Sequence, residues 1–270
     1  MRATLARRAA AELVGTAFLV AAVVGSGIAA SRLSPNDVGL QLLENSLVTG
    51  AVLVALILAL QPVSAAFNPI VTMVERSLGM ITTRDAAAMI VAQFIGGLVG
   101  CVVANLMFDL DPILVASTDR SGSGLWLGEL VATLGLMLVV FGTIRSGRPE
   151  TVAYAVGGYI TAAYWFTSST SFANPAVTFA RMFSDTFAGI APGSAPIFIA
   201  MQLLGGAAAA ILVRLLYPTL APVAETNHDH TARAGRVGGT GSASGSAPGR
   251  IRTCDARFRK PSSSQPKPCS

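Results

Sequence analysis

Long stretches without charged residues run through most of the chain. They cover residues 13–31, 45–74, 86–108, 130–144, 151–180 and 186–213. A helix needs about 20 apolar residues to cross a bilayer, so this pattern predicts a helical protein with several membrane spans. The first stretch is long and further spans follow it, which argues against a cleavable signal peptide.

Two of these stretches, 45–74 and 151–180, each contain 30 residues and an internal Asn-Pro pair, Asn68-Pro69 and Asn174-Pro175. Because proline interrupts a helix, each stretch is predicted to form a full span followed by a shorter helix. The complete prediction is six spans, near 9–30, 42–60, 84–107, 125–144, 150–166 and 193–217, with half-spans at 68–78 and 174–184.

Three short motifs occur twice in the same order, which indicates an internal duplication. The matching segments are 11–16 with 128–133, 67–72 with 173–178, and 93–97 with 202–206. They define one repeat at about 8–108 and a second at about 125–217, within a channel domain of residues 1–218. Each repeat has an odd number of spans, so the second must enter the membrane inverted, as in many transport proteins.

The Asn-Pro pairs are predicted to begin the half-spans, because Asn is a favoured N-cap and Pro a favoured first helical residue. A half-span of 11 residues is about 16 Å long, half the hydrocarbon core of about 30 Å. Two half-spans entering from opposite faces would meet at the midplane. There the side-chain NH₂ groups of Asn68 and Asn174 and two positive helix ends would favour the oxygen of a neutral solute and disfavour cations.

These motifs, together with Glu12 and Glu129 in the first and fourth spans and Gln93 and Gln202 in the third and sixth, resemble the aquaporin (major intrinsic protein) family. The resemblance covers about residues 8–217. It implies an all-α membrane protein of six transmembrane helices and two re-entrant half-helices in an inverted repeat. It also implies a homotetramer with one pore per subunit, which conducts water or small uncharged solutes passively and without a cofactor.

The resemblance also implies a constriction of four positions beyond the Asn pair. Counting from the two motifs places Val48, Ser171 and Val177 there. The fourth position is either Ala162 or, if a loop is two residues shorter, Tyr164.

Val177 stands where most members of the family have an arginine, and the nearest arginine, Arg181, is a full turn further along. The pore is therefore expected to be wider and less polar than that of a strict water channel. Residues 168–177 are similar to a bacterial branch associated with arsenic-detoxification gene clusters. This similarity suggests metalloid hydroxides such as arsenite as solutes, with glycerol or water as lesser candidates.

Glu12 and Glu129 place carboxylates at membrane depth, where ionisable groups are functional candidates. The resemblance implies a structural role instead, in which each glutamate accepts hydrogen bonds from the irregular backbone before a half-span. Gln93 and Gln202 are interpreted as polar links between helices. A proton relay through the glutamates is the alternative, and it would need further titratable partners.

The composition supports a membrane protein, and the net positive charge lies near the C-terminal end of the chain. Of 270 residues, 52% are hydrophobic and 12% are charged, whereas a soluble domain has about a quarter charged residues. The net charge of +5 belongs to residues 219–270, with 8 basic and 3 acidic groups, and the rest of the chain has 11 of each. The body therefore gives no sign of nucleic-acid binding, and the Gly/Ser/Pro-rich end is expected to be a disordered cytoplasmic tail.

Orientation follows from the basic residues of the short links. Arginines precede the first span, follow the first half-span and join the fourth and fifth spans, whereas the 108–124 link is mainly acidic. Because basic residues stay on the cytoplasmic side, both termini are expected to be cytoplasmic in a multi-pass protein of the cell membrane.

Two other classes of function are alternatives to a channel. An ion-coupled secondary transporter could share inverted repeats, but it is expected to place coupling carboxylates near the midplane. A membrane enzyme would need a nucleophile–base pair or a metal set. The histidines both lie in the tail and the cysteines have no metal-binding spacing, so no catalytic residue and no metal site are predicted. A water-selective channel remains the narrower alternative.

Overall fold

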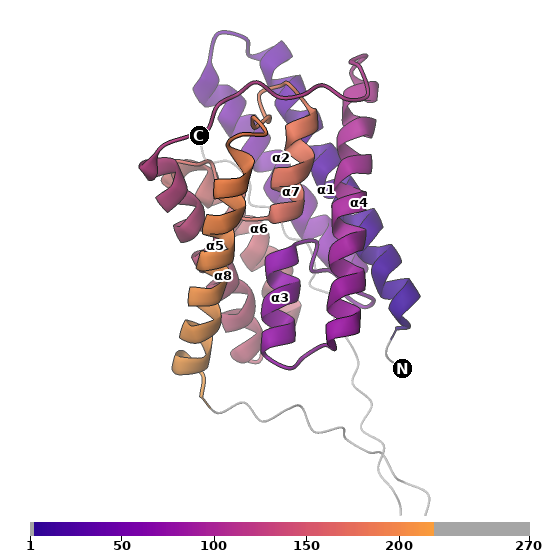
Figure 1. Ribbon diagram of the computed structural model, residues 1–270, viewed down its shortest axis with the longest axis vertical. Helices are drawn as coiled ribbons and strands as arrows, with labels where there is room; N and C mark the ends of the chain where they lie inside the picture. The colour runs from indigo at the N-terminus through magenta and orange to yellow at the C-terminus, as the bar shows by residue number, and fades with distance from the viewer. Residues whose placement is uncertain (1–2, 219–270) are drawn as a thin grey trace, which may run out of the picture. The chain divides into compact units, whose positions relative to one another are not determined.

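The computed structural model describes residues 3–218, and they are helical throughout apart from the connecting segments (Figure 1). The first half contains α1 (Leu5–Leu33), α2 (Val38–Leu60), α3 (Pro69–Ser77) and α4 (Thr83–Met107). The second contains α5 (Ser123–Arg145), α6 (Val152–Phe166), α7 (Pro175–Ala180) and α8 (Ala195–Leu216), with 3₁₀ turns η1 (Pro149–Thr151) and η2 (Arg181–Phe183). The expected tail, 219–270, lies outside the described residues.

The long helices correspond to the predicted spans, with ends that differ by a few residues. Five of them are long and apolar enough to cross a membrane. The sixth, α6, has 15 α-helical residues and is extended at its start by the turn η1. Side-chain caps set several of the starts: Thr4, Asp37 and Thr82 each accept a bond from a backbone N–H of the first turn.

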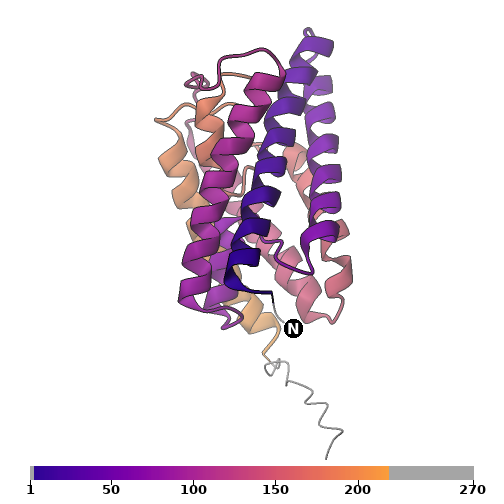
Figure 2. The same cartoon turned by 90° about the vertical axis from the view of Figure 1, so that its right-hand side faces the viewer.

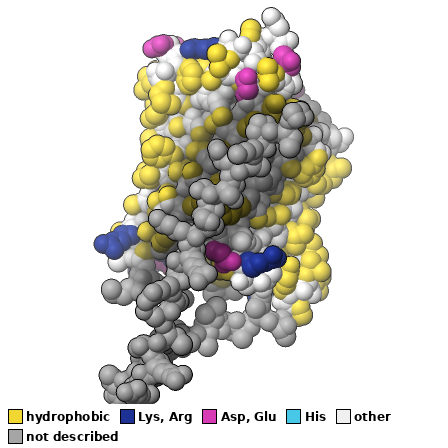
Figure 3. Space-filling view, turned by 180° about the vertical axis from the view of Figure 1, so that it is seen from behind, with side chains coloured by type: hydrophobic (Ala, Val, Ile, Leu, Met, Phe, Trp, Pro, Cys, Tyr) yellow, Lys and Arg dark blue, Asp and Glu magenta, His cyan; other side chains and the backbone are white. Residues whose placement is uncertain are grey.

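The outer surface of the helices is apolar. In Figure 3, hydrophobic side chains cover the flanks of the visible face and the charged side chains gather toward its two ends. Exposed large hydrophobic residues occur on all of the long helices, among them Phe18, Leu47, Val91, Ile95, Leu127, Tyr154, Leu204 and Ile211. Exposed apolar side chains on every long helix suit a surface that faces lipid, because water would disfavour so many of them.

The described chain begins and ends on the same side of the helical body. The start of α1 and the end of α8 both lie at the lower end of Figures 1 and 2. An even number of crossings requires this, so the arrangement agrees with six spans.

Close helix packing repeats in the two halves, with α1 against α4 and α5 against α8. Glycines allow the backbones to approach: a Cβ on Gly96 would lie 2.2 Å from the carbonyl oxygen of Leu13, and one on Gly100 would lie 2.1 Å from that of Ala17. Glycine pairs four residues apart serve this purpose in membrane helices.

We expect Gly100→Ala to destabilise the protein by about 1–3 kcal/mol, because its methyl group would overlap the Ala17 carbonyl and force α1 and α4 apart. Thermal unfolding in detergent measures the effect. Gly158→Ala is the matched control, because Gly158 is also helical but has nothing within 4 Å of its Cβ position. Equal unfolding temperatures for the two variants would contradict the prediction.

Candidate functional site

Two short helices meet end to end in the centre of the protein, α3 below and α7 above in Figure 1. Each begins with a proline that follows an asparagine cap. Asn68 Oδ1 accepts a bond from Ile70 N at 2.9 Å, and Asn174 Oδ1 accepts one from Ala176 N at 3.0 Å. The first turns of both half-helices are thereby satisfied by their own asparagines.

The two asparagines also bind each other's repeat. Asn68 Nδ2 donates to the carbonyl of Ala173, and Asn174 Nδ2 donates to the carbonyl of Phe67, both at 2.8 Å. The sequence predicted that the whole NH₂ group would face the space between the helices. Instead one N–H of each group joins the repeats, which leaves one N–H per asparagine for a solute.

The residues before the two asparagines have an unusual backbone conformation. Phe67 and Ala173 both have φ of 48°, in the left-handed region that side chains with a Cβ rarely adopt. Such strain persists only where the surroundings hold it in place. Its occurrence at equivalent positions shows that the two repeats share the same local structure.

A buried glutamate holds each strained segment. Glu12 accepts bonds from Ala66 N at 2.9 Å and Phe67 N at 2.7 Å, one on each carboxylate oxygen. Glu129 accepts bonds from Phe172 N and Ala173 N, both at 2.9 Å, again one on each oxygen. Both glutamates are fully buried, so the backbone donors satisfy carboxylates that lipid or an apolar core could not.

Gln93 and Gln202 complete these networks from α4 and α8. Gln93 Nε2 donates to Glu12 at 2.8 Å and to Thr72 Oγ1 at 2.9 Å. Gln202 Nε2 donates to Glu129 at 2.6 Å and to Thr178 Oγ1 at 2.8 Å. Each amide therefore links a long helix to the strained segment and to the half-helix that follows it.

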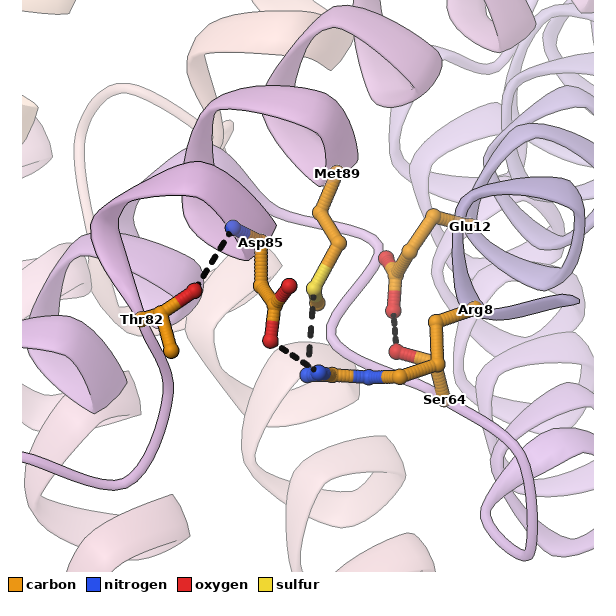
Figure 4. Close-up of polar contacts among 6 residues, drawn as sticks. All are labelled: Arg8, Glu12, Ser64, Thr82, Asp85 and Met89. Atoms are coloured by element: carbon orange, nitrogen blue, oxygen red, sulfur yellow. Dashed lines mark hydrogen bonds and ion pairs between the residues drawn. The ribbon is translucent and has the colours of Figure 1, made fainter. Parts of the chain in front are cut away.

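The first repeat has an additional polar contact beside its glutamate (Figure 4). Arg8 Nη1 lies 2.9 Å from Asp85 Oδ2 and forms the only ion pair within residues 3–218, and Arg8 also contacts the sulfur of Met89. Ser64 donates to Glu12 nearby. These bonds join α1 to α4 and to the segment before α3, at the end of the protein where the described chain begins.

A cavity lies between the two repeats. Its wall comes from α1, α2, α5 and α6, from both half-helices and from the segments before them, and its volume is about 80 Å³. Most lining side chains are apolar, such as Leu53, Val71, Leu136 and Ile160. The polar ones are few: Thr49, Asn68, Tyr164, Ser171, Asn174 and Arg181. A largely apolar cavity with a few polar groups is typical of sites that take small molecules, because the few polar groups orient the molecule.

The structure places Thr49 at the cavity instead of Val48, and of the two alternatives Ala162 and Tyr164 it places Tyr164 there. Val48 is 43% exposed on the outer surface, and the next residue, Thr49, lines the cavity instead. Ala162 is also exposed, whereas Tyr164 is buried and lines the cavity. Thr49 Oγ1 and Tyr164 Oη lie 3.1 Å apart in a hydrogen bond that joins α2 to α6. The helix face changes by about 100° per residue, so an error of one position moves a side chain from lumen to lipid.

Ser171 and Val177 both lie at the cavity wall, as expected from their spacing to Asn174. Ser171 is 3% exposed, and its hydroxyl has no hydrogen-bond partner among residues 3–218. Val177 gives the wall an apolar side chain in the first turn of α7.

Arg181 is, besides Thr49, a polar lining residue that the sequence did not place at the constriction. It lies four residues after Val177, so both share one face of the half-helix, and it lines the same cavity while only 3% exposed. A guanidinium is therefore present in the cavity wall one turn beyond Val177, and the lower polarity relative to a strict water channel stays a prediction. The four-residue spacing was the signal that could have identified it.

The ring of Phe172 is close to two arginines. The Cζ atom of Arg181 is 3.4 Å from the ring centroid, and that of Arg120, in the link between α4 and α5, is 5.1 Å away. Arg120 Nε donates to the carbonyl of Gly189 and Nη2 donates to that of Phe187, which ties this link to the segment after η2. Burial lowers the pKa of the Arg120 guanidinium, and the negative charge of Glu129 acts in the opposite direction.

Comparison with known proteins agrees with this geometry. The sequence pattern of the family described as Major intrinsic protein matches residues 1–151 and 146–242, and thus both repeats. The chain belongs to the major intrinsic protein family. Its fold is the one that the doubled Asn-Pro motif implied: six long helices and two half-helices in an inverted repeat.

Two relatives from the major intrinsic protein family align with this chain over nearly their whole length. The chain is 48% identical over 229 residues to aquaglyceroporin AqpS of Rhizobium meliloti, with 84% of this chain and 97% of that protein aligned. It is 32% identical to the probable aquaporin AqpM of Archaeoglobus fulgidus, with 80% and 99% aligned. The X-ray structure of the aquaglyceroporin from Plasmodium falciparum shares the fold, with a TM-score of 0.64, 18% identity, and 80% and 98% of the chains covered.

Proposed function

We propose that this protein is a passive channel for small uncharged solutes, with its pore in the cavity between the two repeats. The main support is that Asn68 and Asn174 converge where the half-helices meet. Both line a cavity whose wall is otherwise largely apolar. Each amide has a second N–H to offer to the oxygen of a passing solute. Because the rest of the wall is apolar, it offers the solute few groups to bind, and the solute can move on along the pore.

The solute class that this wall supports is neutral and oxygen-bearing: glycerol, water and metalloid hydroxides such as arsenite. Relatives named as aquaglyceroporin and as probable aquaporin support the first two. Valine at position 177 leaves more of the lumen open than arginine would, which favours solutes larger than water. The similarity of residues 168–177 to the arsenic-associated branch supports arsenite.

An ion-coupled transporter fits the geometry less well. Such a protein needs titratable or cation-binding groups that the solute pathway can reach. Glu12 and Glu129 lie behind the cavity wall, and both oxygens of each carboxylate already accept backbone N–H bonds. Their role in this proposal is to hold the segments before the half-helices, with Gln93 and Gln202 as their partners.

Assembly and orientation are part of the proposal. Lipid surrounds the protein in the cell membrane, and the apolar outer surface supports this placement. Arg8, Arg76, Arg84 and Arg145 near the links support cytoplasmic termini. Residues 1–218 form the channel domain in a homotetramer with one pore per subunit, as the family resemblance implies.

Stopped-flow light scattering on proteoliposomes tests the function, with gradients of water, glycerol and arsenite applied in parallel. We expect flux well above that of protein-free vesicles for at least glycerol and water, and no change when proton or sodium gradients are collapsed. Flux that follows an ion gradient would instead support a transporter. Water flux without glycerol or arsenite flux would support the water-selective alternative.

A further inference from the structure

The link between α4 and α5, residues 108–122, is fastened to the segment that follows α7. Ala116 N donates to the carbonyl of Met182 at 2.9 Å. Further along, Ala191 N donates to the carbonyl of Thr118 at 2.8 Å. Main-chain bonds therefore join a link that lies between the two repeats to the irregular part of the second repeat, and they bring the side chain of the link's arginine against that part.

Arg120 is this arginine, and it holds the segment at two carbonyls. Its Nε donates to the carbonyl of Gly189 at 2.9 Å, and its Nη2 donates to that of Phe187 at 3.3 Å. The residue between these two is Ala188, whose carbonyl accepts the Nε of Arg181. Because a guanidinium is planar and rigid, two of its donors fix the spacing of two carbonyls. Arg120 thus restrains the turn that carries the acceptor of Arg181.

The place of Arg181 at the cavity wall depends on such an acceptor. An arginine side chain has several rotatable bonds, so the partners of its guanidinium decide where it lies. Those of Arg181 are the Ala188 carbonyl and the ring of Phe172, whose centroid is 3.4 Å from Cζ. Arg181 lines the cavity and Arg120 does not. Any effect of Arg120 on a solute therefore passes through the protein.

We infer that Arg120 is a positioning residue for solute selectivity, which holds the Ala188 carbonyl in place and thereby keeps the guanidinium of Arg181 against Phe172. The inference rests on the proposed channel function and extends it to a residue outside the pore. Without Arg120, the acceptor shifts and the guanidinium is freer to extend into the lumen. A guanidinium there obstructs glycerol more than water, because glycerol is larger.

Stopped-flow flux of glycerol and of water into proteoliposomes tests the inference. Arg120→Lys keeps the positive charge but replaces the fork by a single ammonium, which cannot hold both carbonyls in the same way. We expect the ratio of glycerol to water flux to fall by about threefold to tenfold, the rate effect of one ordinary hydrogen bond.

Arg32→Lys is the matched control, because Arg32 makes the same kinds of contact at the other end of the link. It donates to the carbonyl of Phe108 and its Cζ is 5.2 Å from the centroid of that ring. These contacts restrain the link but not the turn at Ala188. The control should therefore leave the flux ratio unchanged.

A double variant tests whether Arg120 acts through Arg181. Arg181→Met removes the guanidinium and keeps a long apolar side chain, a kind of replacement that buried charged sites often tolerate. In this background Arg120→Lys should no longer change the flux ratio, because two residues that act through one contact are not additive. A purely structural role of Arg120 would lower the unfolding temperature without this dependence on Arg181.

The outcomes separate the inference from the function on which it rests. If vesicles with the unmodified protein pass glycerol and water no faster than empty vesicles, the proposed function is wrong and the inference falls with it. If they pass both, the channel stands. The inference alone is then overturned by an unchanged ratio in Arg120→Lys, by an equal change in Arg32→Lys, or by a change that persists beside Arg181→Met. Arg120→Gln, which keeps one amide group as donor, gives the same test if the lysine variant does not fold.

Discussion

Val177→Arg is expected to lower glycerol and arsenite flux by about tenfold, the effect of roughly 1.4 kcal/mol on a permeation barrier, and to lower water flux much less. Val177 lines the cavity, so a longer side chain there occupies lumen that a larger solute needs. The new guanidinium would also stand four residues before Arg181 on the same face of the half-helix, and two like charges at this spacing repel. Water is small enough to pass beside them.

Parallel flux measurements at matched protein density test this result. Val177→Leu is the control, because it adds bulk without charge and should lower the flux of all solutes moderately. An unchanged ratio of arsenite to water flux in Val177→Arg would mean that position 177 does not limit the passage of solutes, although its side chain lies at the cavity wall.

Glu12→Ala and Glu129→Ala should be the most destabilising substitutions in the protein, by about 3 kcal/mol or more each. Alanine leaves two backbone N–H donors and a glutamine donor without an acceptor, at about 1–3 kcal/mol for each buried group. It also releases the strained backbone of Phe67 or Ala173. The temperature of thermal unfolding in detergent should fall by about 10 °C in each alanine variant.

Glutamine at the same positions distinguishes hydrogen bonding from charge. Both oxygens of each glutamate accept bonds, so Glu12→Gln and Glu129→Gln keep one acceptor and turn an NH₂ group toward the other donors. We expect stabilities between those of the alanine variants and the unmodified protein. If glutamine were as harmful as alanine at both positions, the negative charge would be the essential property and the structural role would be wrong.

The amino-acid sequence specifies the helices of this protein well because lipid leaves few alternatives. A charge-free stretch of 20 residues in a bilayer must be helical, and a proline within a longer one must end or begin a helix. The duplicated motifs then relate the two halves without any knowledge of side-chain contacts. For this reason the half-helices at Asn68 and Asn174 could be predicted together with the six spans.

The lining of the pore is harder to predict because it depends on register. The count from Asn68 back to α2 crosses the irregular segment before α3, and an error of one residue selected Val48 instead of Thr49. The choice between Ala162 and Tyr164 depended on a loop of unknown length. Arg181 was outside the family's usual position, although its spacing from Val177 places it on the same helical face. The unpaired hydroxyl of Ser171 depends on contacts that no sequence pattern encodes.

The reciprocal bonds between Asn68 and Ala173 and between Asn174 and Phe67 have a consequence for biogenesis. While the ribosome has produced only the first repeat, the amide of Asn68 and the carbonyl of Phe67 lack their partners, because these are encoded more than 100 residues later. The re-entrant segment of the first repeat therefore reaches its final form only after the second repeat has been inserted. Neither repeat can complete the meeting point of the half-helices by itself, so the pore needs both repeats to be synthesised and inserted.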